Sequence, residues 1–309
     1  MEHQFGANWL ARAAYVGSET YHLPNRKSIN PGQFFCAPVG PNCSAEENAK
    51  NGTLILPQFN TAVLNFSHSN ANYQSGQFTL EKRMSHGLQF TANYTYSHTI
   101  DNATAYQSSS FYNPYCEACR RGNSDLNFPQ IFVANFIYQT PSPSGWNSAT
   151  RGILGGWQIS GIYRAQSGIP FSIRSGLNRS YTVVGRDLAD FANSGHSVHV
   201  DHGSLQYLPV DPQTHQSVDF VQPNFGFQGD TGRNIVAGPG LNSWDMGLSK
   251  NFRFGERYRL QFRWEMFNAF NHTNFYYPNN TLSSGSFGQI QSTGYIPART
   301  QQAALKFYF

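Results

Sequence analysis

Apolar and polar residues alternate almost without error in the segment YRLQFRWEMF at 258–267. Every second residue is apolar, namely Tyr258, Leu260, Phe262, Trp264 and Met266. Successive side chains of a β-strand point to opposite faces, so this pattern predicts a strand with one apolar face and one polar face. A soluble sandwich would bury the apolar face, whereas an outer-membrane barrel would turn it towards lipid.

The same period of two recurs in other segments, and no stretch of useful length has a helical period. The pattern predicts eight strands, at 5–16, 75–84, 88–98, 130–139, 156–167, 242–252, 257–268 and 299–309. Each is about ten residues long, which is the length that a tilted strand needs to cross the hydrocarbon layer of a membrane. Strands of globular sheets have about five or six residues, so the lengths favour the barrel.

The connections between these predicted strands alternate between long and short. The long ones are 17–74, 99–129, 168–241 and 269–298, and the short ones are 85–87, 140–155 and 253–256. Short periplasmic turns and long extracellular loops give this alternation in an up-and-down barrel. We therefore predict an all-β fold, an antiparallel up-and-down transmembrane β-barrel, with residues 1–309 forming a single barrel region.

The polar face of the predicted strands carries arginines. Each arginine exposed to lipid at the membrane midplane would cost about 2 to 4 kcal/mol, so this face must be wet. It would line the lumen through Arg257, Arg259, Arg263, Glu265 and Arg164. Lys82 and Lys250 fall on the apolar face, but both lie near short turns, where a lysine costs about 0 to 1 kcal/mol.

The chain ends in ALKFYF, with Leu305, Phe307 and Phe309 at alternate positions. A last strand with an aromatic carboxy-terminal residue is typical of a signal for insertion into the outer membrane. A core strand that happens to end the chain would look similar, and the sequence leaves both interpretations open.

Composition excludes several other classes of protein. Charged residues make up 12% of the chain, about half the usual share, and the net charge of +4 comes from scattered Lys and Arg. No basic run or basic helix suggests nucleic acid as a partner. No apolar run reaches the roughly 18 residues of a membrane helix, and no signal peptide follows Met1.

The cysteines fall into two close pairs in turn-rich stretches, Cys36 with Cys43 and Cys116 with Cys119. Disulfides within each loop are the favoured interpretation, and free thiols or a metal site are the alternatives. Disulfides would place the loops in an oxidising compartment.

The segment HSVHVDHG places His196, His199 and His202 at a spacing of three residues. A surface histidine cluster is favoured over a metal site. The glycine-rich segment GDTGRN lacks the Lys-Ser/Thr of a phosphate loop and predicts tight turns. No serine occurs as G-x-S-x-G and no carboxylate pair stands out, so we expect no enzymatic activity and no cofactor. Loop aromatics could stack on a sugar or siderophore or pack within their loops: Phe111, Tyr112, Tyr115, Phe225 and Phe227.

Five segments carry a resemblance to a known family. They are QFTLEKRMSHGLQFTANYTYSHTIDNA, RRGNSDLNFPQIFVANFIY, LGGWQISGIYRAQSGIPFSI, GDTGRNIVAGPGLNSWDMGLSKNFRFGERYRLQFRWEMFNAFNHTNF and FGQI. They resemble the C-terminal part of Oar-like TonB-dependent transporters. The resemblance covers roughly residues 5–309. The sequence departs from the family at Gln130, where a histidine is usual, and in the loops that carry cysteine.

The resemblance implies the C-terminal third of a barrel of about 22 strands whose plug domain, signal peptide and TonB-contacting segment are missing. It implies a location in the outer membrane of a Gram-negative-type bacterium, with membrane lipid and the barrel assembly machinery as partners. Uptake of an unidentified ligand would need the plug and the TonB system, and the arginines of the polar face would contact the plug. A self-standing small porin or adhesin barrel and a secreted all-β carbohydrate-binding sandwich are the alternatives.

Overall fold

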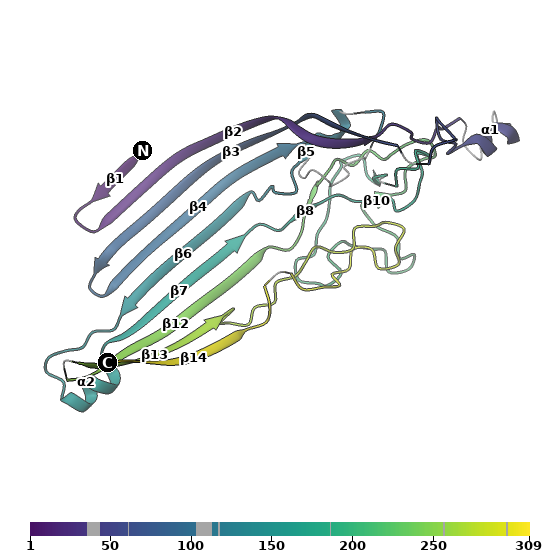
Figure 1. Cartoon of the computed structure of the whole chain (residues 1–309). Coiled ribbons are helices and arrows are strands. Elements are labelled where there is room, and N and C mark those ends of the chain that lie inside the picture. Colours follow the sequence, from purple (N-terminus) through teal and green to yellow (C-terminus); the bar gives the residue numbers. More distant parts are fainter. Residues whose placement is uncertain are drawn as a thin grey trace.

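The computed structural model describes residues 1–35, 44–60, 62–102, 113–116, 118–185, 187–255, 257–294 and 296–309. One continuous antiparallel sheet of ten strands dominates these residues, in the order β1-β2-β3-β4-β6-β7-β12-β13-β14, with β5 beside β4 (Figure 1). The long strands are β2 (Trp9–Ser28), β3 (Val63–Ser85), β4 (Leu88–Asp101), β6 (Gln130–Gln139), β7 (Trp157–Gln166), β12 (Leu241–Phe254), β13 (Tyr258–Phe267) and β14 (Thr300–Tyr308).

The remaining elements are short. They are β1 (Glu2–Phe5), β5 (Gly122–Asn123), β8 (Pro170–Phe171), β9 (Asp190–Phe191), β10 (Phe220–Val221), β11 (Val236–Ala237), α1 (Ala45–Lys50), α2 (Ser148–Leu154) and a 3-10 turn at Ala118–Arg120. The small strands form two further two-stranded sheets, β8 with β11 and β9 with β10. No helix among the described residues is long and apolar enough to span a membrane.

Each predicted strand has a counterpart in the sheet, but the predicted bounds of the first two strands were wrong. The segment 5–16 begins with a hairpin turn, where Gly6 has a φ of 61°, and β2 starts only at Trp9. The predicted long connection 17–74 is strand at both of its ends, because β2 and β3 stay paired from Gly17 opposite Gln74 to Ser28 opposite Val63. These extensions are mostly polar on both faces, so hydrophobic alternation gives no signal for them.

All short connections of the large sheet lie at one end and all long ones at the other (Figure 1). The predicted alternation of connections therefore corresponds to a real separation of the two ends. The connection from β6 to β7 contains α2, whose first turn is capped by Asn147 through a 2.7 Å bond from the Thr150 amide. Sequence periodicity missed this helix because seven residues make only two turns.

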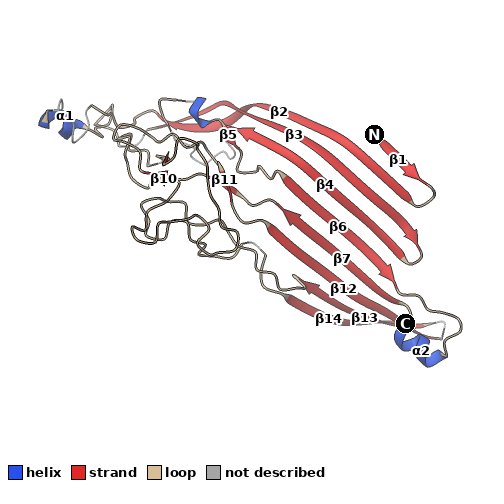
Figure 2. Cartoon of the chain, turned by 180° about the vertical axis from the view of Figure 1, so that it is seen from behind, coloured by secondary structure: helices blue, strands red, loops and turns tan. Residues whose placement is uncertain are grey.

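The sheet is open in the described part of the chain, because its strand order is linear and β1 is not paired with β14 (Figure 2). The sandwich alternative is wrong, since the described residues form no second large sheet facing the first. The hydrophobic core lies in the long loops and not on the sheet. Its buried members are Phe171, Ile173, Ala189, Tyr207, Leu208, Phe220, Val236 and Phe287. We call this packed region of the loops, residues 168–240 and 268–290, the loop cap.

Candidate membrane faces and loop clamp

The predicted apolar face is continuous across neighbouring strands. Residues opposite one another in an antiparallel pair share a face, and Leu260 lies opposite both Phe252 and Phe307. Likewise Phe262 lies opposite Leu305. The apolar residues of β13 and the terminal segment therefore form one surface. Phe307 stacks beside Tyr258 and Phe309 and is still 56% exposed, and Leu305 is 68% exposed, so this surface is largely uncovered.

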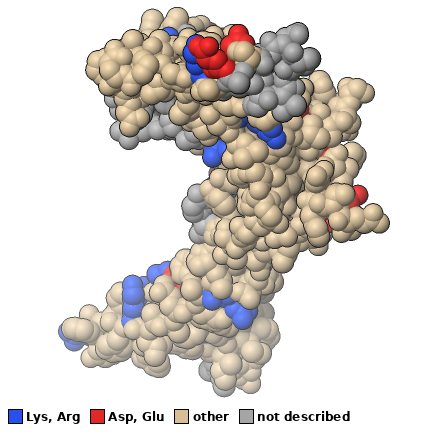
Figure 3. All heavy atoms as spheres, turned by 90° about the vertical axis from the view of Figure 1, so that its right-hand side faces the viewer, with Lys and Arg blue, Asp and Glu red and all other residues tan. Residues whose placement is uncertain are grey.

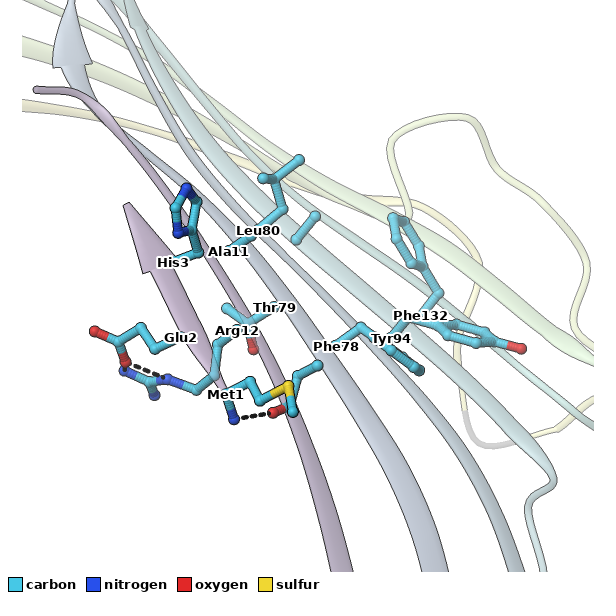
Figure 4. Close-up of a pocket in the computed structure, with 12 residues that line it drawn as sticks. Met1, Glu2, His3, Ala11, Arg12, Phe78, Thr79, Leu80, Tyr94 and Phe132 are labelled. Carbon is cyan, nitrogen blue, oxygen red and sulfur yellow. Dashed lines mark hydrogen bonds and ion pairs between the residues drawn. The ribbon is translucent and has the colours of Figure 1, made fainter. Parts of the chain in front are cut away.

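The apolar face is hollowed near β1, where small side chains lie between large ones. The hollow has a volume of about 550 Å³. Figure 4 shows its floor, with Ala11 on β2 and Leu80 on β3, and the rings of Phe78, Tyr94 and Phe132 around it. A hollow of this size with a mostly apolar lining suits an acyl chain or the side chains of an adjoining strand.

Two lysines on the apolar face bind backbone carbonyls at the short-turn end of the sheet. Lys82 Nζ donates to the Ser85 and Leu88 carbonyls at 3.0 and 2.8 Å. Lys250 Nζ donates to the carbonyls of Ile153 and Gly155, beside α2, at 3.0 and 2.7 Å. Both ammonium groups are thus held at the rim of the sheet, where a lysine costs little.

The predicted polar residues of β13 form their own contacts on the opposite face. Arg263 forms an ion pair with Glu265, which also accepts a hydrogen bond from Gln302. The Arg259 guanidinium lies 4.1 Å from the centre of the Tyr308 ring. On β7, Arg164 donates to Gln166 at 2.6 Å, and Arg257 is exposed at the turn before β13. These groups satisfy one another in water-accessible positions.

From the loop side the molecule is a curved body with a hollow on one side (Figure 3). Several Lys and Arg side chains lie around that hollow, while most of the visible surface is uncharged. The few charged residues are therefore distributed unevenly over the face seen in this view.

The three candidate histidines do not converge. His199 Nδ1 contacts the buried carboxylate of Asp219 at 2.7 Å. The His196 ring stacks on Phe191 at 4.6 Å, and His202 meets Tyr207 edge to face at 5.5 Å. Among the described residues no group of three His, Cys, Asp or Glu side chains is placed to hold a metal ion.

A disulfide joins Cys116 and Cys119, whose Cα atoms are 5.4 Å apart. It closes a single tight turn, and the Cys119 amide donates to the Cys116 sulfur at 3.1 Å. The other predicted pair, Cys36 and Cys43, lies outside the described residues, as do Phe111 and Tyr112.

A buried ion pair fastens the loop cap to the sheet. Arg233, in the loop between β7 and β12, pairs with Asp101 at the end of β4, and both side chains are at most 3% exposed. Arg233 also donates to the Asn123 carbonyl at 3.0 Å. The neighbouring Asn234 donates to Asn123 and to the Asp125 carboxylate at 2.9 and 2.6 Å. We call these five residues the loop clamp.

Sequence reasoning missed the loop clamp because GDTGRN was interpreted only as tight turns. A signal was available, since GDTGRN and RRGNSDLN both belong to the segments that carry the family resemblance. A buried arginine needs a charged partner, but more than a hundred residues separate these two segments in the sequence. Only the fold shows which carboxylate pairs with it.

A long antiparallel sheet with one apolar face left exposed, and with long loops at one end, defines an outer-membrane β-barrel protein. The chain belongs to the outer membrane beta barrel domain family, which it matches over residues 1–302. It is accordingly a protein of the outer membrane.

A search of solved structures found similarity to the outer membrane transporter YddB from Escherichia coli, with 12% sequence identity and a TM-score of 0.49. The match covers 99% of this chain and 31% of the transporter chain, so the chain spans about a third of that protein's length. No curated protein matches the sequence.

Proposed function

We propose that the chain is the barrel segment of a TonB-dependent transporter of the Oar-like type. It takes up a ligand when it is joined to a plug and further barrel strands. The observation that carries this proposal is the open sheet. Every residue of β14 is exposed, and β2 beyond Ala14 has a neighbour on one side only. A barrel of about 22 strands would supply the missing partners.

In this proposal the apolar face, including Tyr258, Leu260, Phe262, Trp264 and Met266, contacts membrane lipid. The polar face, with Arg257, Arg259, Arg263, Glu265 and Arg164, lines the lumen and contacts the plug. The terminal residues Leu305, Phe307 and Phe309 serve the assembly machinery as an insertion signal. The long loops face the outside of the cell and the short turns face the periplasm. No residue acts in catalysis.

A self-standing porin or adhesin is the second candidate, and the open sheet argues against it. Its strands would have to close into a barrel by pairing β1 with β14. An exposed strand edge invites pairing with other chains, so an isolated open sheet would aggregate. Neighbouring strands of a wider barrel remove this hazard.

The test is a direct one on the complete gene product. The coding sequence upstream of Met1 should encode a plug and a short TonB-contacting segment in a continuous frame. The purified product of that frame should bind the isolated periplasmic domain of TonB in calorimetric titration, and deletion of the contacting segment should abolish binding. An upstream sequence that encodes no plug, or a product that does not bind TonB, would refute the proposal that the chain belongs to a transporter.

A further inference from the structure

Three long loops enclose a cavity of about 450 Å³ at the loop end of the molecule. The described lining residues are Gln33, Phe34, Asn113, Tyr115, Ser180, Thr182, Gly226, Phe227 and Gln228. They come from the loop after β2, the loop after β4 and the loop after β7. Small-molecule sites fall in this range of volumes and form where several elements converge.

The chemistry of the described lining is neutral. Five of its side chains are uncharged hydrogen-bonding groups, three are aromatic, and none carries a charge. Anions such as phosphates are commonly bound by Arg and Lys side chains, and carboxylates are common ligands of cations. The lining therefore favours a neutral ligand with many hydroxyl groups and an apolar ring face. A sugar has this chemistry.

Two of the aromatic rings are uncovered. Phe227 is 64% exposed and Tyr115 62% exposed, although the loop cap has an apolar core. Tyr115 is fixed by a 3.1 Å hydrogen bond from its hydroxyl group to the Gly32 carbonyl. A fixed ring that faces solvent at a cavity supplies a flat surface for stacking.

The polar wall of the cavity is held rigid by the loops behind it. Asp187 accepts hydrogen bonds from both the amide and the hydroxyl group of Ser180, each at 2.7 Å. The Ser180 hydroxyl group lies 2.9 Å from that of Thr182. Gln228 Nε2 donates to the Thr182 hydroxyl at 3.3 Å, while its Oε1 is buried without a partner among the described residues.

The aromatic wall joins two of the loops. Phe34 stacks on Tyr181 at 5.8 Å, and Tyr181 stacks on Phe225 at 5.9 Å. Gly226 has a φ of 88°, and a side chain there would meet the Phe34 ring at 2.4 Å. The glycine therefore lets the ring approach the backbone of the other loop, which closes this side of the cavity.

We propose that this cavity binds a neutral oligosaccharide, with the exposed rings of Phe227 and Tyr115 stacking on a sugar ring. The inference rests on the proposed function, because it names the class of ligand that the transporter captures at the cell surface. It assigns capture to the long loops alone, so binding does not depend on TonB.

The experiment is calorimetric titration of the full gene product in detergent micelles. The probes are the neutral hexasaccharides maltohexaose, cellohexaose and mannohexaose, with the anionic hexagalacturonate for comparison. At least one neutral hexasaccharide should bind saturably, and Phe227→Ala should raise its Kd by about tenfold or more, as expected for loss of a stacked ring.

Phe59→Ala is the matched control, because Phe59 is 56% exposed in the loop after β2 and does not line the cavity. It should leave the Kd within about twofold, since no stacking contact is lost. Binding by none of the three neutral probes, binding of hexagalacturonate alone, or equal effects of Phe227→Ala and Phe59→Ala would overturn the proposal. Loss of TonB binding with intact sugar binding would refute only the proposed function.

Discussion

The sheet and the loop cap use the same apolar residue types in opposite ways. In the loop cap Phe220 is 2% exposed and Ile173 is fully buried, as in a soluble domain. On the sheet Phe78 is 52% exposed and Leu305 68% exposed. Burial of apolar surface drives both arrangements, but the loop cap supplies its own apolar partners while the sheet depends on an external apolar phase. The two regions are therefore stabilised by different surroundings, and substitutions should separate them.

The largest expected effect is on the loop clamp. Arg233→Met removes the guanidinium from a buried ion pair with the Asp101 carboxylate, which costs about 3 to 5 kcal/mol. The loop cap should become sensitive to added protease while the strands stay protected in the membrane. Limited proteolysis of outer-membrane vesicles with mass spectrometry measures both regions.

The double variant Asp101→Leu, Arg233→Met is the control for this prediction. It removes the buried Asp101 carboxylate together with the Arg233 guanidinium, so the loop cap should regain part of its protease resistance. Equal protease sensitivity of the single and double variants would show that the ion pair itself is not what fastens the loop cap.

The next effect concerns the sheet alone and uses two neighbouring residues of β4. Ala92→Arg places a charge on the apolar face between Leu80 and Ala134, at a cost of about 2 to 4 kcal/mol in lipid. Thr91→Arg places the same charge on the polar face opposite Glu81 and should cost little. Urea unfolding in lipid vesicles, followed by the heat-dependent gel shift, compares them. Similar losses for both variants would contradict the assignment of faces.

A smaller effect is expected where the sheet meets the membrane surface. Lys250→Met removes the side-chain donor of the Gly155 carbonyl and leaves the Ile153 carbonyl with Trp157 Nε1, so the connection around α2 should loosen by about 1 kcal/mol. Hydrogen exchange of residues 148–156 measures this loosening. Lys50→Met, which breaks an exposed pair with Glu46 on α1, should leave that exchange unchanged.

The smallest effect is a pH dependence of the loop cap. Burial raises the pKa of Asp187 above the ordinary aspartate value, and the hydrogen bonds from Ser180 offset only part of that rise. The folded chain then binds this proton more tightly than the unfolded chain. Stability therefore falls as pH rises from the ordinary aspartate pKa to the raised one, and it is constant above that window.

Asp187→Asn should remove this contribution, because the amide does not titrate. The difference in protease resistance between the parent chain and Asp187→Asn should shift in favour of the variant as pH rises through the window. Identical pH profiles would show that Asp187 titrates alike in the folded and unfolded chain.

How well the sequence predicts each strand depends on whether one face of that strand is apolar. Hydrophobic alternation located β4, β6, β7, β12, β13 and β14, because one face of each strand is apolar. It failed for residues 17–28 and 63–74, whose pairing rests on backbone hydrogen bonds between largely polar segments. The disulfide of Cys116 and Cys119 follows from their close spacing. The three histidines, although spaced three residues apart, do not converge on a metal site in the described part of the chain.

The sequence by itself determined the strand class, the two faces of the sheet and the separation of short turns from long loops. Each of these follows from local periodicity, which neighbouring residues encode. Only the tertiary structure decided that Arg233 pairs with Asp101, that three loops share one cavity, and that the sheet edges stay open. Such contacts join residues far apart in the chain, and their energies depend on burial and geometry that no local pattern contains.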